Sequence, residues 1–293
     1  MKPLLAHVYE PHRVTYPCYV QPKLNGIRAL YQNGNFQSRD QLPFPAGLLA
    51  HLATPLQGIF GPEVILDGEL YVHGWSLQRI NAAVTPVRQQ PTEDTVQVQY
   101  HVFDRVDYQW SFHDRYANGI QLPLVGSVCR VHTRRVESEL QADVAYAEFV
   151  EKGYEGCMYR LGDCPYTVPK QEIRDCDTRI FTGLRLPRYL SDKSNRCWHL
   201  LKRKDWQDDE FECVGVVEGE GKLQGMLGAL TCASHATRPG EGRHSVFSVG
   251  SGLTDAERQH YWTNPPIGRL IKVKYLCLSD AGIPLNPTIL CIL

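Results

Sequence analysis

A lysine close to the N-terminus has neighbours that suit covalent chemistry on a phosphate. It opens the hexapeptide Lys23-Leu24-Asn25-Gly26-Ile27-Arg28. A lysine amine is nucleophilic only when unprotonated, and burial or nearby positive charge lowers its pKa. Arg28 could supply that charge and could also hold a phosphate through two hydrogen bonds, and Gly26 has no Cβ to keep a ligand away from the backbone. The hexapeptide alone fits a surface turn equally well, because Asn-Gly is a common hairpin signal.

The overall composition fits a globular protein without membrane-spanning or secretory segments. The chain has 293 residues, of which 43% are hydrophobic and 22% charged, a length that allows two domains or one large one. No apolar run approaches the length of a membrane span, and the first residues lack the apolar core of a signal peptide. Ten cysteines are scattered without a CxxC pair, which indicates reduced thiols and argues against a zinc ribbon. We therefore expect a cytoplasmic protein with no membrane partner.

Charge is unevenly distributed, although the net charge is only −1. Residues 165–206 contain ten Lys or Arg and five Asp or Glu. Such a local excess of positive charge is typical of a surface that faces phosphates. A solvated loop that carries both charges is the alternative.

Short β-rich runs separated by turn residues predict strands in the first two thirds of the chain. Asn33-Gly34 predicts a hairpin between two of them. Helical spacing is clearest over residues 137–152, where four apolar residues fall on one face: Leu140, Val144, Tyr146 and Val150. The expected strands are 16–20, 27–31, 64–72 (interrupted at 67–69) and 96–103, and a second expected helix is 76–83.

The character of the sequence changes after Lys204. Four short β-like runs follow, separated by Gly-rich turns and one polar helix candidate at residues 254–262. Five or so strands in fewer than ninety residues suggest a small barrel such as an OB-fold. The β-like runs are residues 211–217, 230–233, 246–249 and 271–276.

Five short motifs follow the lysine in a fixed order. They are Ser38-Arg39-Asp40, Leu66-Asp67-Gly68-Glu69-Leu70, His101-Val102-Phe103-Asp104, Tyr154-Glu155-Gly156-Cys157-Met158 and Leu200-Leu201-Lys202-Arg203-Lys204. Their order and spacing resemble the ATP-dependent DNA ligases of the covalent nucleotidyltransferase superfamily, in particular the minimal two-domain ligases of phages and viruses. The resemblance covers almost the whole chain. It implies an α+β nucleotidyltransferase domain with antiparallel sheets over residues 1–204, followed by an all-β OB-fold domain over residues 205–293.

The resemblance assigns the nucleotide-binding residues. Lys23 matches the nucleophile that attacks the α-phosphorus of ATP and forms lysyl-AMP. Arg28 and Arg39 match arginines that hold the nucleotide and the 5′-phosphate of a nick. Phe103 matches the aromatic residue that stacks on adenine, although a strand phenylalanine taken alone is more often part of a core.

The remaining assignments concern charge at the phosphates. Glu69 matches a glutamate associated with the ribose or the metal, and Glu155 matches a metal-binding carboxylate; each could otherwise belong to an ordinary turn. Lys202 and Lys204 alternate, so on a strand both point to the same face. There they could neutralise the α-phosphate and help keep Lys23 unprotonated; two lysines on a solvated face are the alternative.

The C-terminal part supports the same resemblance. Residues 218–230, residues 247–254 with Arg258 downstream, and residues 272–275 are similar to segments of the ligase OB domain. Capping enzymes and most RNA ligases do not carry this combination, which favours a DNA ligase.

Several positions depart from the family pattern. Asn25 stands where an aspartate is usual, and Lys193 stands where an arginine is expected, with Arg196 as the other candidate. Leu285 and Leu293 occupy places that normally carry basic residues, which puts the efficiency of the first step in doubt. Residues 163–188 look like an insertion that embraces DNA.

The expected function is therefore the ATP-dependent sealing of 3′-OH/5′-phosphate nicks in duplex DNA by a monomer, with Mg²⁺ (or Mn²⁺) as the metal. The expected location is the cytoplasm, or the host cell cytoplasm if a phage encodes the protein. An RNA ligase acting on nicked or hybrid strands, a guanylyltransferase that uses GTP, and a catalytically weak nick-binding protein are the alternatives. Asn25, Leu285 and Leu293 support the last of these, whereas the retained lysines and glutamates oppose it.

Overall fold

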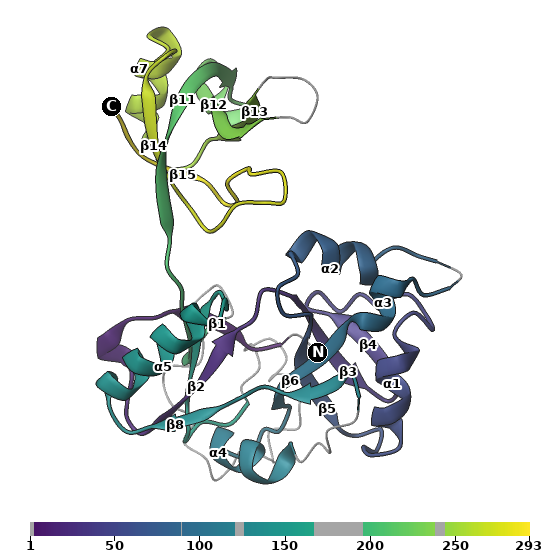
Figure 1. Cartoon of the computed structure of the whole chain (residues 1–293). Coiled ribbons are helices and arrows are strands. Elements are labelled where there is room, and N and C mark those ends of the chain that lie inside the picture. The colour runs from purple at the N-terminus through teal and green to yellow at the C-terminus, as the bar shows by residue number, and fades with distance from the viewer. Residues whose placement is uncertain (1–2, 89, 121–125, 167–195, 238–243) are drawn as a thin grey trace. The chain divides into compact units, whose positions relative to one another are not determined.

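The computed structural model describes residues 3–88, 90–120, 126–166, 196–237 and 244–293 (Figure 1). Contacts within the chain divide it into two compact units, Met1–Lys204 and Asp205–Leu293. This division falls where the character of the sequence changes. Each unit has a hydrophobic core of its own.

The first unit contains two five-stranded sheets (Figure 1). The first sheet has the order β1 (Leu5–Val8), β10 (Arg196–Arg203), β9 (Gly156–Leu161), β2 (Cys18–Lys23) and β8 (Arg134–Val136). The second has the order β4 (Asn35–Ser38), β3 (Ile27–Gln32), β5 (Ile65–Tyr71), β6 (Gln99–Arg105) and β7 (Val128–Arg130). Of the strand pairs in the described residues, β1–β10 and β6–β7 are parallel and the others antiparallel, which confirms the predicted α+β class.

Helices cover one face of each sheet and leave the other face free for a pocket. Helix α5 (Glu139–Glu151) packs on the first sheet, and α1 (Ala50–Gln57) and α2 (Leu77–Val84) pack on the second (Figure 1). Within the described ranges, none of the helices has the length and apolar character that crossing a bilayer requires. In the described part of this unit, the other helical segments are η1 (Pro11–Arg13), α3 (Glu93–Gln97), α4 (Phe112–Asp114) and η2 (Arg115–Gly119).

The buried face of α5 differs from the predicted one. Of the four residues expected on it, only Tyr146 is buried; Leu140, Val144 and Val150 have exposed fractions of 73%, 51% and 40%. The helix instead packs Ala142, Ala145, Tyr146 and Phe149 against the first sheet. Both sets have helical spacing, and alanines let a helix approach a sheet closely, so hydrophobicity alone could not select the face.

Strand β5 is continuous, whereas an interruption at residues 67–69 was predicted. Gly68 makes this possible, because the Tyr100 ring crosses it and the Tyr100 hydroxyl donates to Ala29 O (3.1 Å) and Leu66 O (3.0 Å). Opposite Gly68 the register of β6 shifts by one residue, which is a β-bulge at Phe103. Asp67 and Gly68 therefore do not form a turn, and Gly68 allows the Tyr100 ring to pack closely against β5.

Two further segments correct the sequence prediction. The expected strand 96–103 begins only at Gln99, because residues 93–97 form α3. A capping box between Thr92 and Thr95 stabilises the N-terminus of this helix. Lys23 is the last residue of β2, which excludes the alternative that it lies in a surface turn.

In its described residues, the second unit is a five-stranded antiparallel sheet with one α-helix, as predicted, and the 3-10 helix η4 (Gly221–Leu223). The order is β13 (His244–Val249), β12 (Leu227–Thr237), β11 (Gln207–Glu218), β14 (Leu270–Tyr275) and β15 (Thr288–Ile292). Thr254 caps α7 (Asp255–Thr263) through a capping box with Glu257. Arg258 of this helix donates to the carbonyl oxygens of Leu227 and Gly228 (both 2.9 Å) and of Gly250. It therefore fixes the turn that follows β13.

The packing at Gly68 gives a stability prediction. A Cβ at this position would lie 2.6 Å from His101 O and 2.6 Å from the Tyr100 ring. Because a backbone oxygen must then shift, we expect Gly68→Ala to lower the free energy of unfolding by about 2 kcal/mol. Urea denaturation of the full chain, followed by circular dichroism, measures this. The control is Gly58→Ala, where φ is −76° and the nearest atom to the new Cβ is 3.7 Å away, so the change should stay within about 0.5 kcal/mol.

A histidine of β6 gives a pH prediction. Burial, and then neighbouring His73, lower the pKa of His101 from 6.5 to about 4. As the pH falls from 6.5 to 4, the unfolded chain takes up a proton at His101 that the folded chain does not. The stability that neutral His101 contributes is therefore fully present above pH 6.5. The free energy of unfolding decreases as the pH falls from 6.5 to 4, by up to about 1.4 kcal/mol per pH unit.

We expect His101→Gln to flatten the pH dependence of urea denaturation between pH 4 and 6.5. His12→Gln is the control, because the His12 side chain is 72% exposed. Equal slopes in the wild type and the His101 variant would contradict the prediction.

Candidate active site

A pocket lies between the two sheets of the first unit. Its empty volume is about 580 Å³, which includes space open to solvent. Both sheets contribute to it because alternate side chains of their strands point away from the helix-covered cores. The lining residues are Gln21, Pro22, Lys23, Leu24, Arg28, Glu69, Phe103, Met158, Arg160, Leu200 and Lys202.

The Lys23 amine contacts the carboxylate of Glu155. The two residues are placed by strand pairing, because Lys23 lies opposite Gly156 in the β2–β9 ladder and Glu155 N donates to Lys23 O (3.1 Å). Gly156 has no room for a Cβ, which would collide with the backbone of Arg203 on β10. The side chains of Lys23 and Glu155 are 19% and 10% exposed, so this ion pair is largely shielded from water.

Two more lysines lie beside this pair. Lys204 Nζ donates to the second oxygen of Glu155 (3.3 Å), so one carboxylate serves two amines. Burial lowers the pKa of Lys202, and the nearby cations, first Arg196 and then Lys204, lower it further. The structure thus brings Lys23, Lys202 and Lys204 together, as the motifs predict.

Leu201 and Arg203 point to the other side of β10, as alternation requires. Leu201 is buried in the core beneath α5, and Arg203 forms an ion pair with Asp143 of that helix. The opposite orientation of these residues keeps Lys202 on the pocket side.

Glu69 lies on β5 at the edge of the pocket. It accepts a hydrogen bond from Gly26 N (3.2 Å). Burial raises the pKa of Glu69 to about 7, although Lys23 and Arg28 favour the charged form. A carboxyl group with such a pKa can present either a proton or a charge to a ligand near neutral pH.

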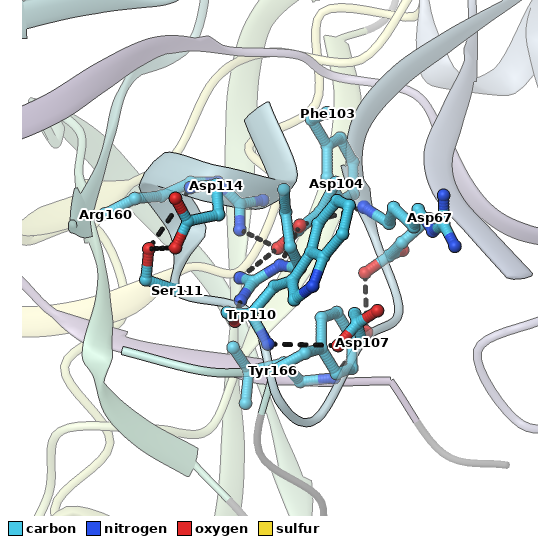
Figure 2. A network of polar contacts seen from close by, with 12 residues as sticks. Asp67, Phe103, Asp104, Asp107, Trp110, Ser111, Asp114, Arg160 and Tyr166 are labelled. Carbon is cyan, nitrogen blue, oxygen red and sulfur yellow. Dashed lines mark hydrogen bonds and ion pairs between the residues drawn. The ribbon is translucent and has the colours of Figure 1, made fainter. Parts of the chain in front are cut away.

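Arg28 is held by the protein itself. Its guanidinium donates to both oxygens of Asp67 (2.9 and 2.5 Å) and to Leu4 O (2.6 Å). Burial alone would lower the pKa of Arg28, but the Asp67 carboxylate outweighs this and raises it. Tyr166 donates to the same carboxylate (2.7 Å), so Arg28 has a fixed position in the pocket wall (Figure 2).

Phe103 lines the pocket, on the side of β6 opposite Val102, which lies in the helix-covered core. Because of the β-bulge at Phe103, the next residue, Asp104, also turns away from that core and pairs with the lining residue Arg160. Two guanidinium carbons lie near the ring centroid, Arg28 at 5.4 Å and Arg160 at 5.1 Å.

Six pocket residues were not among the predicted site residues: Gln21, Pro22, Leu24, Met158, Arg160 and Leu200. Alternation could have found Gln21, Met158 and Arg160. Gln21 lies two residues before Lys23 on β2, and Met158 and Arg160 alternate along β9 after Gly156.

Other predicted residues lie elsewhere. The Arg39 side chain is 60% exposed beside Asp40 (3.8 Å) and does not line the pocket. Lys193 and residues 167–188 of the expected insertion lie outside the described residues. Arg196 donates to Ala6 O (2.5 Å) at the start of β10. Leu285 and Leu293 belong to the second unit.

The carboxylates of the pocket fit a Mg²⁺ ion that is shared with phosphates. No group of three or more His, Cys, Asp or Glu side chains able to hold a metal occurs in the part of the chain that the structure describes. Mg²⁺ is commonly bound by one or two carboxylates together with substrate phosphates. Glu69 and Glu155, on either side of Lys23, provide this kind of incomplete ligand set.

Comparison with known proteins finds DNA ligases that are similar to this chain in part of its sequence and in its fold. Residues 218–292 match the family model of the DNA ligase OB-like domain. A DNA ligase of Haemophilus influenzae is 34% identical over 89 residues, which are 30% of this chain and 29% of that protein. The alignment thus spans less than a third of the relative's length.

Solved structures are similar over the entire chain. A Lig E DNA ligase, described as binding DNA with a minimal scaffold, is 21% identical with a TM-score of 0.75, and the match covers 100% of this chain and 99% of the other. The Chlorella virus DNA ligase-adenylate is 22% identical with a TM-score of 0.52 over 100% and 98%. These similarities confirm the predicted fold, an α+β domain with antiparallel sheets followed by an OB-like domain. The chain shares the fold of these DNA ligases, and its residues 218–292 match the DNA ligase OB-like domain.

Proposed function

We propose that the protein is an ATP-dependent DNA ligase that seals 3′-OH/5′-phosphate nicks through lysyl-AMP and DNA-adenylate intermediates. The observation that carries this proposal is the contact of the Lys23 amine with Glu155 inside a pocket that Lys202 also lines. The fold similarities support it independently.

In the first step Lys23 is the nucleophile. Its nitrogen attacks the α-phosphorus of ATP, a nitrogen–phosphorus bond forms, and the bond to the leaving pyrophosphate breaks. The amine must lose a proton, and the Glu155 carboxylate is in hydrogen-bond contact with it. Glu155 therefore acts as the proton acceptor.

The neighbouring lysines act on the phosphate charge. Phosphoryl transfer depends on positioning and on neutralising charge that develops at the phosphate oxygens. Lys202 lines the pocket, and Lys204 is tethered to Glu155, so both ammonium groups have access to an α-phosphate that Lys23 attacks. Fixed charges in a partly buried site stabilise such a transition state more strongly than mobile ones in water.

The rest of the pocket suits a nucleoside. The Phe103 ring provides a stacking surface for the adenine base, and Glu69 can accept a hydrogen bond from a ribose hydroxyl. Glu69 and Glu155 would hold Mg²⁺, or Mn²⁺ in its place, which neutralises phosphate charge when bound.

The later steps act on DNA. AMP passes from Lys23 to the 5′-phosphate of a nick, and the 3′-hydroxyl then displaces AMP to join the strands. The exposed Arg39 is available for a DNA phosphate. Contacts of this kind imply binding of a monomer to nicked DNA with little sequence preference and strong salt dependence.

The test is the sealing of a 5′-labelled nicked DNA duplex with ATP and Mg²⁺, resolved on a denaturing gel. We expect a ligated product with the wild type and a loss of at least about a thousandfold in rate with Lys23→Ala, because the nucleophile is removed. Lys152→Ala is the matched control, since Lys152 is an exposed lysine three residues from Glu155, and it should retain full activity.

Other outcomes separate the alternatives. Sealing only of nicks with a 3′-ribose strand would identify an RNA ligase, and labelling with GTP instead of ATP a guanylyltransferase. Nick binding without an adduct would indicate a binding protein. Undiminished sealing by Lys23→Ala would place the nucleophile elsewhere.

A further inference from the structure

Arg160 is a buried arginine that holds pocket groups in place. It lies on β9 and is 4% exposed. Its Nη1 donates to Asp104 Oδ2 (2.7 Å) (Figure 2). Its Nε donates to Gln21 Oε1 (2.6 Å). These contacts tie β9 to β2 within the first sheet and to β6 of the second.

The Gln21 amide is fixed by this arrangement. Its Oε1 accepts from Arg160, and its Nε2 donates to Phe103 O (3.1 Å) and Thr133 Oγ1 (2.9 Å). Both N–H groups are used, so the amide cannot turn over without losing three hydrogen bonds. Gln21 is 1% exposed, yet it lines the pocket two residues before Lys23.

Arg160 reaches Phe103 in two ways. Its guanidinium carbon lies 5.1 Å from the centroid of the ring, which is a cation–π distance. Through Gln21 it also fixes the Phe103 carbonyl. The bulged residue, which the β6 ladder does not pair with β5, is therefore held from the first sheet.

Burying the charged group of Arg160 beside Arg115 and Asp104 costs desolvation free energy. Asp104 also accepts two hydrogen bonds from Arg115 (2.7 and 3.1 Å), so two guanidiniums share one carboxylate. Burial lowers the pKa of Arg160, and Asp104 only partly opposes this effect. An apolar side chain at position 160 would avoid the desolvation cost, so buried charge here is not explained by stability alone.

We propose that Arg160 is a positioning residue for nucleotide binding: it fixes the Phe103 ring and the Gln21 amide in the pocket before a nucleotide enters. This inference rests on the proposed function only as far as the identity of the nucleotide is concerned. Binding to groups that are already ordered avoids the entropy cost of ordering them.

The test compares Arg160→Gln with Arg115→Gln. Both residues are buried and both bind Asp104, but of the two only Arg160 contacts Gln21 and Phe103 in the described part of the chain. We expect Arg160→Gln to raise the KM for ATP in lysyl-AMP formation about tenfold while kcat stays within about twofold. Arg115→Gln should leave the KM unchanged, whatever its effect on stability.

A second readout does not depend on ATP. In the nucleotide-free protein, NMR should show the Gln21 side-chain amide protected from hydrogen exchange in the wild type and in Arg115→Gln. Exchange should be about tenfold faster in Arg160→Gln. Arg160→Lys keeps the charge and serves if Arg160→Gln does not fold; it should give the same direction of change with a smaller size.

Equal Gln21 protection in the two variants, or an equal rise of KM in both, would overturn the positioning role. Absence of any adduct in the wild type would overturn the proposed function instead, and Gln21 exchange would still decide the role of Arg160.

Discussion

The Glu155 carboxylate is the group on which the arrangement of the site depends, because it lies between the amines of Lys23 and Lys204. Without it, two ammonium groups would face each other in a partly buried pocket at a considerable electrostatic cost. Its position follows from strand pairing and from Gly156, where no Cβ fits.

Two other carboxylates organise the pocket wall in the same manner. Asp67 fixes Arg28, and Asp104 fixes Arg160 (Figure 2). Asp104 also pairs with Arg115, which does not line the pocket. Of the charged side chains that line the described pocket, Lys23, Arg28, Arg160 and Lys202 are cationic and Glu69 is acidic, which leaves an excess of positive charge and suits an anionic ligand. The wall therefore combines a fixed geometry with a field that favours phosphates.

Much of this site could be predicted from the sequence, since Lys23, Glu69, Phe103, Glu155 and Lys202 do line or adjoin one pocket. Short motifs carry such information because strand alternation and register place residues of known spacing on one face. Alternation along β9 could have placed Arg160 in the pocket, but its contact with Asp104 joins two different sheets, and spacing within one strand does not reveal such a contact. The buried face of α5 was also predicted wrongly, because both sides of that helix are apolar and the shape of the sheet decides between them.

The central claim is that Lys23 carries a covalent nucleotide, and tandem mass spectrometry of tryptic peptides tests it directly. The full chain would be incubated with ATP and Mg²⁺ in the absence of DNA and then digested. The account predicts AMP on the peptide that contains Lys23, attached to that side chain alone. A protein that acquires no AMP, or that carries it on another residue while Lys23 stays unmodified, would contradict the account.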